Sequence, residues 1–343
     1  MPGLTRTTLA CTVVAAALAA ASVAQAQSVE NFYKGKTVYM IIGYPPGGSN
    51  DLYAREVARF IGRHIPGNPN VVSQSMPGAG SLAAANHLYN IAAKDGTVMG
   101  LVAGTIPLEA ALGAKNVKLK ADKFSWIGRV SSSTNIVFTW HTSPVKTIQD
   151  AMKTQSVLAA TGASSTVTIY PEVLNKVVGT KFKMVMGYKG SAACMLAVER
   201  GEAEGHSTSY DGMNAAHPDW VKDKKINILV QIAVKRDPEM KDIPTMIELG
   251  KTDDDKKVLR VVTSASEVGK AVFGPPGIPA DRLAALRKAF DDTMKDPEFD
   301  AELKKLGLTL DPLSGKDLAA LVEEVGNMPP DIFKRVKDIY PVN

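Results

Sequence analysis

Glycine, proline and small polar residues form a turn near the start of the chain that is suited to holding an anion. Residues 43–51 read Gly-Tyr-Pro-Pro-Gly-Gly-Ser-Asn-Asp and lie between a β-branched run and a helical pattern. Backbone N–H groups at a helix start attract negative charge, and glycine lets a ligand approach the backbone closely. No Gly-Lys-Ser/Thr follows and the dinucleotide spacing is missing, so nucleotide chemistry is disfavoured. The alternative is an ordinary tight turn.

A second glycine turn follows the next predicted strand. Residues 76–81 read Met-Pro-Gly-Ala-Gly-Ser and lead into an alanine-rich helical stretch. Ligands of open α/β sheets bind at the carboxyl ends of the strands, where such turns can converge. Two turns at successive strand ends therefore favour a binding crevice. Tyr44 could form the floor of this crevice, or it could simply pack in the core.

Serine and histidine side chains raise the alternative of an exported serine hydrolase. Ser164, Ser165 and Ser191 are the candidate nucleophiles, and His206 is a histidine that could face the crevice. The chain has no Gly-x-Ser-x-Gly elbow, and no carboxylate stands at a spacing that would orient a histidine. No His-x-x-x-His or paired-cysteine spacing indicates a metal site. We therefore expect no catalytic residue, no metal and no cofactor.

These turns need regular elements to position them, and the sequence alternates short β-branched runs with longer amphipathic stretches. Buried strands are predicted over residues 37–43, 70–73, 98–103, 157–160, 182–186, 226–233 and 270–273. The alternation indicates an α/β protein.

Capping residues mark the ends of several predicted helices. Ser49 can cap the first helix, Thr147 and Asp150 form a later helix start, and Pro279 opens a long helix. In the run 251–257, three aspartates stand between lysines. We expect this run to be a solvated surface loop.

The amino terminus has the pattern of a cleaved signal peptide. Arg6 provides the positive region, residues 9–24 are apolar and rich in small residues, and Ala-Gln-Ala at 24–26 matches the signal peptidase pattern. The apolar run is shorter than the roughly 20 residues that a membrane span needs. We therefore predict that residues 1–26 are removed and that the mature chain is exported.

Length and composition indicate a soluble protein of two lobes. The chain has 343 residues, 45% apolar and 22% charged, which fits neither a disordered nor an integral-membrane class. The formal charge of +5 is spread along the chain, so nucleic acid is not an expected partner. Cys194 is the single cysteine beyond residue 26, so no intrachain disulfide can form, as suits a bacterial periplasm. We expect Cys194 to be a small core residue.

Five short motifs occur in order along nearly the whole mature chain. They are Pro-Pro-Gly-Gly-Ser-Asn-Asp at 45–51, Pro-Gly-Ala-Gly at 77–80, Asp-Gly-Thr at 95–97, Tyr-Lys-Gly-Ser-Ala at 188–192 and Pro-Pro-Gly-Ile-Pro at 275–279. Together they are specific, whereas Pro-Pro-Gly-Gly alone would not be. In this combination the chain resembles the periplasmic solute-binding proteins of tripartite tricarboxylate transporters, the TctC or Bug group.

The resemblance implies an α/β, two-lobe periplasmic binding protein fold of the type II-like, Venus flytrap kind, with a ligand cleft between the lobes. Residues 27–129 would form the first part of lobe 1, residues 130–265 lobe 2, and residues 266–343 the return to lobe 1 and the C-terminal helices. The protein would be no enzyme. It would be a periplasmic monomer that delivers a small carboxylate to transporter membrane subunits, or alternatively a ligand-sensing partner of a membrane receptor.

The resemblance also implies which residues bind the ligand. Beside Tyr44, the first-lobe turns that grip a ligand carboxylate map onto Ser49, Asn50, Asp51, Ala79, Gly80 and Ser81, with Thr105 as a neighbour. The second-lobe turns that would contact the far end of the ligand contain Ser164, Ser165, Thr166, Tyr188 and Ser191, and Thr208 and Ser209 would follow a further strand.

The chain departs from the family pattern at several positions. Met76 stands where an arginine is frequent, Ser81 where glycine is usual, and Thr168 where many members have histidine. The segment 203–209 lacks the aspartate that several members have near its end, and an amine-bearing ligand would need such a partner. The predicted ligand is therefore an aliphatic or aromatic carboxylate that is not an amino acid.

Overall fold

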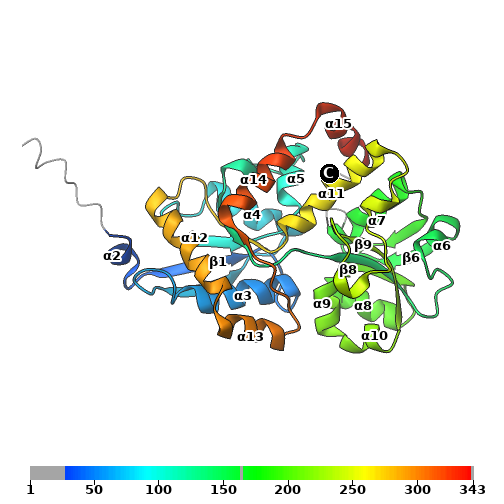
Figure 1. Ribbon diagram of the computed structural model, residues 1–343, viewed down its shortest axis with the longest axis horizontal. Coiled ribbons are helices and arrows are strands. Elements are labelled where there is room, and N and C mark those ends of the chain that lie inside the picture. The colour runs from blue at the N-terminus through cyan, green and yellow to red at the C-terminus, as the bar shows by residue number, and fades with distance from the viewer. Residues whose placement is uncertain (1–27, 163–164, 341–343) are drawn as a thin grey trace, which may run out of the picture.

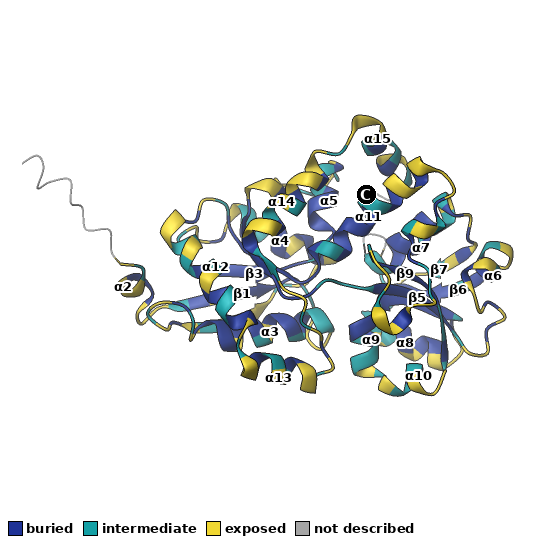
Figure 2. Ribbon diagram, in the orientation of Figure 1, coloured by how far each residue is buried: buried dark blue, intermediate teal, exposed yellow. Residues whose placement is uncertain are grey.

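The chain forms two lobes that lie side by side, each built around a β-sheet (Figure 1). The computed structural model describes residues 28–162 and 165–340. The predicted signal peptide, residues 1–26, lies outside the described residues, and so does Ser164. Helices flank both sheets, with buried strands inside and exposed helix faces outside (Figure 2). The predicted α/β class with two lobes is confirmed.

The first sheet has six strands in the order β11-β4-β10-β3-β1-β2. These strands are β1 (Thr37–Ile42), β2 (Asn70–Ser75), β3 (Val98–Leu101), β4 (Ser125–Arg129), β10 (Ala271–Gly274) and β11 (Leu313–Ser314). Strand β1 pairs in parallel with β2 and β3, whereas β10 is antiparallel to β3 and β4. A strand from late in the chain therefore completes the middle of a sheet that the first strands begin.

Helices pack on both faces of the first sheet because its central strands are apolar on both sides. Met40 and Ile42 lie in one buried cluster with α3 and α12, and Ile41 lies in another with α4 and α14. The helices of this lobe are α2 (Val29–Tyr33), α3 (Ser49–Ile61), α4 (Leu82–Asn90), α5 (Ile106–Ala111), α12 (Ala280–Met294), α13 (Pro297–Lys305) and α14 (Gly315–Gly326).

The second sheet has five strands in the order β7-β6-β8-β5-β9. These strands are β5 (Asn135–Trp140), β6 (Ser156–Ala159), β7 (Phe182–Val185), β8 (Gly205–Ser209) and β9 (Ile226–Ile232). Strand β5 is antiparallel to β8 and β9, whereas β6 is parallel to β7 and β8. The helices around this sheet are α6 (Ile148–Lys153), α7 (Thr166–Val177), α8 (Ser191–Glu199), α9 (Tyr210–Ala216) and α10 (Pro218–Lys222).

Helix α11 (Asp253–Val268) and the C-terminal helix α15 (Pro330–Ile339) connect the two lobes. Helix α11 contacts α5 and α14 as well as α7 and α15. Leu108 of α5, Leu259 of α11 and Val336 of α15 belong to one buried apolar cluster with residues of the second sheet. The junction therefore contains packed helices as well as chain crossings. The lobe boundaries at 129/130 and 265/266 stay a prediction.

The seven predicted strands are all present, although their ends differ by a few residues. The prediction that all seven are buried is wrong for β2 and β7, because both lie at sheet edges and are largely exposed. Thr147 and Asp150 form the predicted capping box of α6. Strands β4, β5 and β11 were not predicted, and β8 was expected only as a further strand without bounds. None of the helices in the described part of the chain combines the length and apolar character that a membrane span needs.

Three local predictions are wrong. Gly48, in an extended conformation, is the N-cap of α3, so Ser49 is already the first helical residue. The run 251–257 begins α11, because Thr252 and Asp255 form a capping box and aspartates favour the positive end of a helix. Thr208 and Ser209 lie within strand β8, not after it, because pairing with β5 continues to Ser209.

Candidate functional site

The first glycine turn lies between β1 and α3 and is held in shape by Asp51. The buried Asp51 carboxylate accepts a hydrogen bond from Gly47 N–H at 3.0 Å and pairs with Arg55 Nε at 2.9 Å. Asp51 therefore satisfies its own turn and does not present its charge to a ligand. Ser49 and Asn50 are half-buried at the start of α3. The first N–H groups of a helix lack intrahelical partners and suit an anion.

The second glycine turn has an unusual backbone. Ala79, Gly80 and Ser81 are consecutive residues with φ values of 45°, 64° and 77°. Non-glycine residues in this region cost about 1 to 3 kcal/mol each, and such conformations cluster at functional sites. Turns of this kind bring successive N–H groups into a concave arrangement that binds anions. Among the predicted residues, the segment 79–81 has the backbone best suited to an anion, and ligand binding there stays a prediction.

The two glycine turns contact each other, as the strand-end argument predicts. Ser81 Oγ donates to Gly43 O at 2.8 Å, and Ser75 Oγ donates to Tyr44 O at 2.7 Å. A Cβ atom at Gly43 would lie 2.7 Å from Ser81 Oγ, so this position requires glycine. Tyr44 is half-buried against the core of the first lobe, and its burial raises the pKa of its phenol despite a hydrogen bond with Ser81.

Three buried groups near these turns were not predicted. Glu109 of α5 is buried, and this burial raises the pKa of its carboxyl group. A hydrogen bond that Thr105 donates to the carboxyl group opposes the shift. Glu109 is close enough to Tyr44 and Tyr340 to raise the pKa of both phenols, and Tyr170 is similarly influenced by Tyr44. The sequence shows that Thr105 and Glu109 are four residues apart and can lie on one face of a helix. It does not show that the Glu109 carboxyl group is buried.

In the second lobe, the turn before α7 uses its hydroxyl groups internally. Thr161 Oγ1 donates to Ser165 Oγ at 2.7 Å, and Ser165 Oγ donates to Gly162 O at 2.8 Å. Thr168 Oγ1 donates to the same carbonyl at 2.9 Å. Thr166, the first residue of α7, is half-buried. Ser165 therefore supports the turn.

Ser191 and His206 form the pair that a serine hydrolase would need. Ser191 Oγ lies 2.7 Å from His206 Nε2 and 2.8 Å from Thr208 Oγ1, while His206 Nδ1 lies 2.8 Å from Ala159 O. Burial lowers the pKa of His206 to about 4, against a weaker opposing effect of the Ala159 carbonyl. An imidazolium here would lack the buried carboxylate that stabilises it in a triad. The pair is therefore poorly suited to catalysis.

Candidate residues of the two lobes meet directly. Ser49 Oγ of α3 lies 3.3 Å from Ser209 Oγ of β8. A Cβ atom on Gly212 would lie 3.0 Å from Ser49 Oγ, so glycine permits this close approach. Nearby along α9, Asp211 pairs with the fully buried Lys270 at 3.2 Å. The structure thus brings the first turn, the end of β8 and the start of α9 together.

Tyr188 and Cys194 belong to the core of the second lobe. Tyr188 is half-buried against the apolar cluster that contains Cys194. Burial raises the pKa of the Cys194 thiol to about 12, so it is the core residue that was predicted. Within residues 28–162 and 165–340, no group of three or more His, Cys, Asp or Glu side chains is placed to hold a metal ion. A shallow depression of about 580 Å³ is lined by α12 alone and contains no candidate residue.

Comparison with known proteins identifies relatives that match most of the chain. The family described as "Tripartite tricarboxylate transporter family receptor", TctC, matches residues 54–337. The "UPF0065 protein in gbd 5'region" of Cupriavidus necator is 26% identical over 306 residues, which cover 86% of each chain.

Two solved structures have a similar fold. The periplasmic binding protein BugD has a TM-score of 0.68 at 19% identity, over 90% of this chain and 99% of its own. MatC from Rhodopseudomonas palustris, solved with bound malate, has a TM-score of 0.65 at 21% identity, over 89% of this chain and 98% of its own. Because the family match spans most of the chain, this protein belongs to the TctC receptor family, whose members are periplasmic solute-binding proteins and not enzymes.

Proposed function

We propose that this chain binds a small organic carboxylate, other than an amino acid, between its lobes and presents it to the membrane subunits of a tripartite tricarboxylate-type transporter. In this proposal residues 1–26 are a cleaved export signal and the mature protein acts as a monomer in the periplasm. The observation that carries the proposal is the left-handed backbone of Ala79, Gly80 and Ser81, hydrogen-bonded to the first glycine turn.

A buried carboxylate needs several hydrogen-bond donors, because an unpaired buried charge is costly. Backbone N–H groups of the segment 79–81 and of the start of α3 can supply such donors without an arginine. Hydrogen bonds to a charged group are each worth about 1.5 to 3 kcal/mol. The malate bound by MatC is a carboxylate of the size that we propose here.

The first experiment is a thermal-shift screen of the protein that begins at residue 27, against a library of carboxylic acids, followed by calorimetry on each hit. A ligand at about 100 times its dissociation constant stabilises a protein by about 2.7 kcal/mol. A stabilising acid that is recovered unchanged supports binding. Turnover of the acid, or failure of every carboxylate to bind, contradicts the proposal.

The anion cradle can be tested with a matched pair of glycine variants. Gly80→Val and Gly113→Val both place a β-branched residue at positive φ, 64° and 69°, but Gly113 follows α5 in open space. We expect Gly80→Val to weaken binding of every hit at least tenfold, since about one charged hydrogen bond is lost. Gly113→Val should bind as the wild type does. Equal binding by both variants would show that the anion lies elsewhere.

A further inference from the structure

A line of hydrogen bonds runs from the core of the second lobe to the junction between the lobes. It begins at Ala159 O in β6, passes through His206 and Ser191, and ends at Thr208 Oγ1 near the end of β8. Each step is between 2.7 and 2.8 Å long. His206 is fully buried, whereas Thr208 is 8% exposed and Ser191 is half-buried. His206 therefore cannot reach a ligand, whereas the half-buried Ser191 and Thr208 at the end of the line can.

The chemistry of the groups fixes the direction of every hydrogen bond in this line. A backbone carbonyl only accepts, so His206 Nδ1 carries the hydrogen that Ala159 O receives. In a neutral imidazole, Nε2 is then an acceptor, and Ser191 must donate its single hydroxyl hydrogen to it. The contact between Ser191 and Thr208 therefore needs the hydrogen of Thr208. Burial lowers the pKa of His206 to about 4, which keeps the imidazole neutral near pH 7.

Thr208 consequently has only oxygen lone pairs left to offer a ligand. Its single hydrogen is used by Ser191, and a threonine hydroxyl has no other to donate. The next residue, Ser209, contacts Ser49 of the first lobe, so Thr208 is one residue away from a contact between the lobes. An ionised carboxylate placed against Thr208 would bring two hydrogen-bond acceptors together, which is unfavourable. A ligand hydroxyl could instead donate a hydrogen bond to Thr208 Oγ1.

We propose that His206, acting through Ser191, makes Thr208 an obligate hydrogen-bond acceptor and thereby selects carboxylates that carry a hydroxyl or another uncharged donor at their far end. This inference rests on the function proposed above and narrows the ligand class. Thr208 is the residue that touches the ligand, and His206 is a positioning residue because its effect passes through Ser191.

The test compares acids that differ by one hydroxyl group, by calorimetry on the protein that begins at residue 27. Malate with succinate, and 3-hydroxybutyrate with butyrate, are suitable pairs. We expect the hydroxy acid of at least one pair to bind about tenfold more tightly, the value of one good hydrogen bond. In His206→Phe, Ser191 and Thr208 can turn their hydrogens outward, so the ratio should fall to within about twofold. Thr208→Val should also lose the preference, and Thr208→Ser should keep it.

Two further measurements separate positioning from mere structural support. His217→Phe changes a histidine that stacks on Trp220 in the same lobe, and it should leave the preference intact. The ¹⁵N chemical shifts of His206 in the ligand-free protein should report a hydrogen on Nδ1 and none on Nε2. The opposite tautomer would overturn the inference without any ligand, even if a variant folds poorly.

The outcomes for the inference and for the proposed function are distinct. Equal affinities within both pairs, or a preference that survives His206→Phe, overturn the selection by Thr208 but leave carboxylate binding intact. If these four acids and the whole carboxylate library fail to bind, the proposed function is wrong and this inference fails with it.

Discussion

Ser81 of the first lobe and Thr208 of the second lobe are hydroxyl residues to which we assign different roles in ligand binding. Ser81 donates its hydroxyl hydrogen to Gly43 O within its own lobe. We therefore expect Ser81 to affect anion binding by holding the backbone of the two glycine turns in place, not by donating its hydroxyl to the ligand. Thr208 Oγ1 lies 2.8 Å from Ser191 Oγ, and this contact decides whether its hydroxyl can donate or only accept. We propose that the first lobe supplies generic donors for any carboxylate, whereas side chains of the second lobe choose among carboxylates.

This division of roles predicts different effects of two kinds of substitution. Ser81→Ala should weaken all carboxylates by similar factors, because it loosens the cradle that they share. Thr166→Ala and Thr208→Ala should reorder the affinities, since each removes a group that only some acids use, at a cost of about 1 to 3 kcal/mol or roughly 5- to 150-fold. Calorimetry on three acids decides the matter. Equal proportional losses at the second-lobe positions would contradict it.

His206 also predicts how stability depends on pH. Burial lowers its pKa to about 4, from the ordinary value of 6.5. Between these values the unfolded chain binds a proton that the folded chain does not, so the free energy of unfolding falls as the pH falls from 6.5 to 4, by about 3 kcal/mol. Urea denaturation of the wild type and of His206→Phe at several pH values measures this difference. The free energy of unfolding of His206→Phe should fall less between pH 6.5 and 4 than that of the wild type. If it falls equally in both proteins, His206 is not the group responsible.

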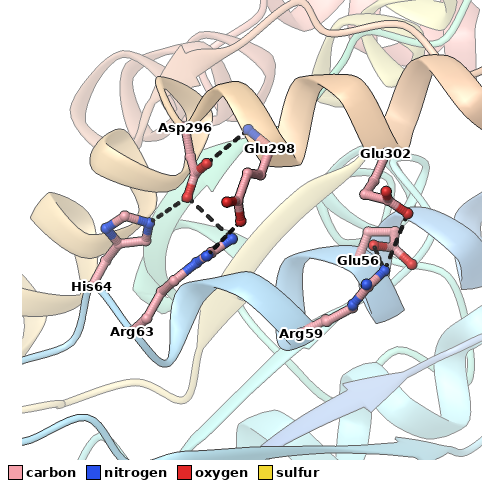
Figure 3. A network of polar contacts seen from close by, with 7 residues as sticks. All are labelled: Glu56, Arg59, Arg63, His64, Asp296, Glu298 and Glu302. Atoms are coloured by element: carbon pink, nitrogen blue, oxygen red, sulfur yellow. Dashed lines mark hydrogen bonds and ion pairs between the residues drawn. The ribbon is translucent and has the colours of Figure 1, made fainter.

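At the scale of elements, a network of charged side chains joins α3 to the start of α13 (Figure 3). Asp296 caps α13 by accepting a hydrogen bond from Glu298 N–H at 2.9 Å, and its other oxygen lies 3.1 Å from His64 Nε2 and 3.3 Å from Arg63. Partial burial opposes its ionisation, but these hydrogen bonds and the Arg63 charge lower the pKa of the carboxyl group. Farther along, Arg59 connects Glu56 and Glu302 (Figure 3).

The members of this network should contribute unequally to stability. Asp296→Ala removes a helix cap and the contacts with His64 and Arg63, so we expect a loss of about 1 to 2 kcal/mol in the free energy of unfolding. Glu298→Gln removes one exposed ion pair with Arg63, and we expect a change below about 0.5 kcal/mol. Urea denaturation of both variants provides the comparison. Similar losses would mean that the surface charge pairs, and not the cap, hold α13 in place.

Elements with a strong local signal could be predicted from the sequence, and those that depend on distant partners could not. Thr147 and Asp150 stand at the spacing of a capping box, and the two glycine turns carry their own backbone requirement, so α6 and the first-lobe turns were predicted correctly. Strand β4 was missed because it contains glycine and arginine, and it is buried only by pairing with β10 from much later in the chain.

The contacts within the candidate site also depend on distant parts of the chain and could not be predicted from the sequence. Ser191 was predicted to face the ligand and His206 was suspected of facing the crevice, but only the pairing of β6 with β8 brings both beside Ala159. Glu109 and Tyr340 come together because the C-terminal helix packs beside α7 and α11, and no local pattern in the sequence encodes that contact.

At the scale of the whole molecule, one buried ion pair joins the lobes. Lys270, between α11 and β10, is fully buried and lies 3.2 Å from Asp211 of α9 and 3.0 Å from Ser132 O. Burial lowers the pKa of the Lys270 ammonium group, and the Asp211 carboxylate opposes this shift. This contact exists only while α9 lies against the junction, so it contributes to holding the lobes together.

Removal of this lysine should be costly and should also change the shape of the protein. Lys270→Met leaves a buried carboxylate without its partner, so we expect a loss of about 3 to 5 kcal/mol in stability. The double variant Lys270→Met/Asp211→Asn should recover part of it. Lys288→Met is the control, since the Lys288–Asp292 pair is exposed and worth about 0.5 kcal/mol or less.

Small-angle scattering tests the effect of Lys270 on closure. A bound ligand stabilises the closed state through contacts that exist only when both lobes engage it. We expect ligand-free Lys270→Met to be more extended than the ligand-free wild type and to become compact when ligand is bound. Identical scattering of the two ligand-free proteins would mean that the ion pair does not determine the position of the lobes.

The strand order of the first sheet has a consequence for the way this chain is made. Strands β3 and β4 are neighbours of β10, not of each other, so both keep an unpaired edge until Ala271–Gly274 has been synthesised. The second sheet uses only residues 135–232, and all its strands are available earlier. Long-range pairing is slow, and open edges invite pairing with other chains. The lobe that begins the chain is therefore the last to be completed, and its open edges need protection from aggregation until the final quarter of the chain arrives.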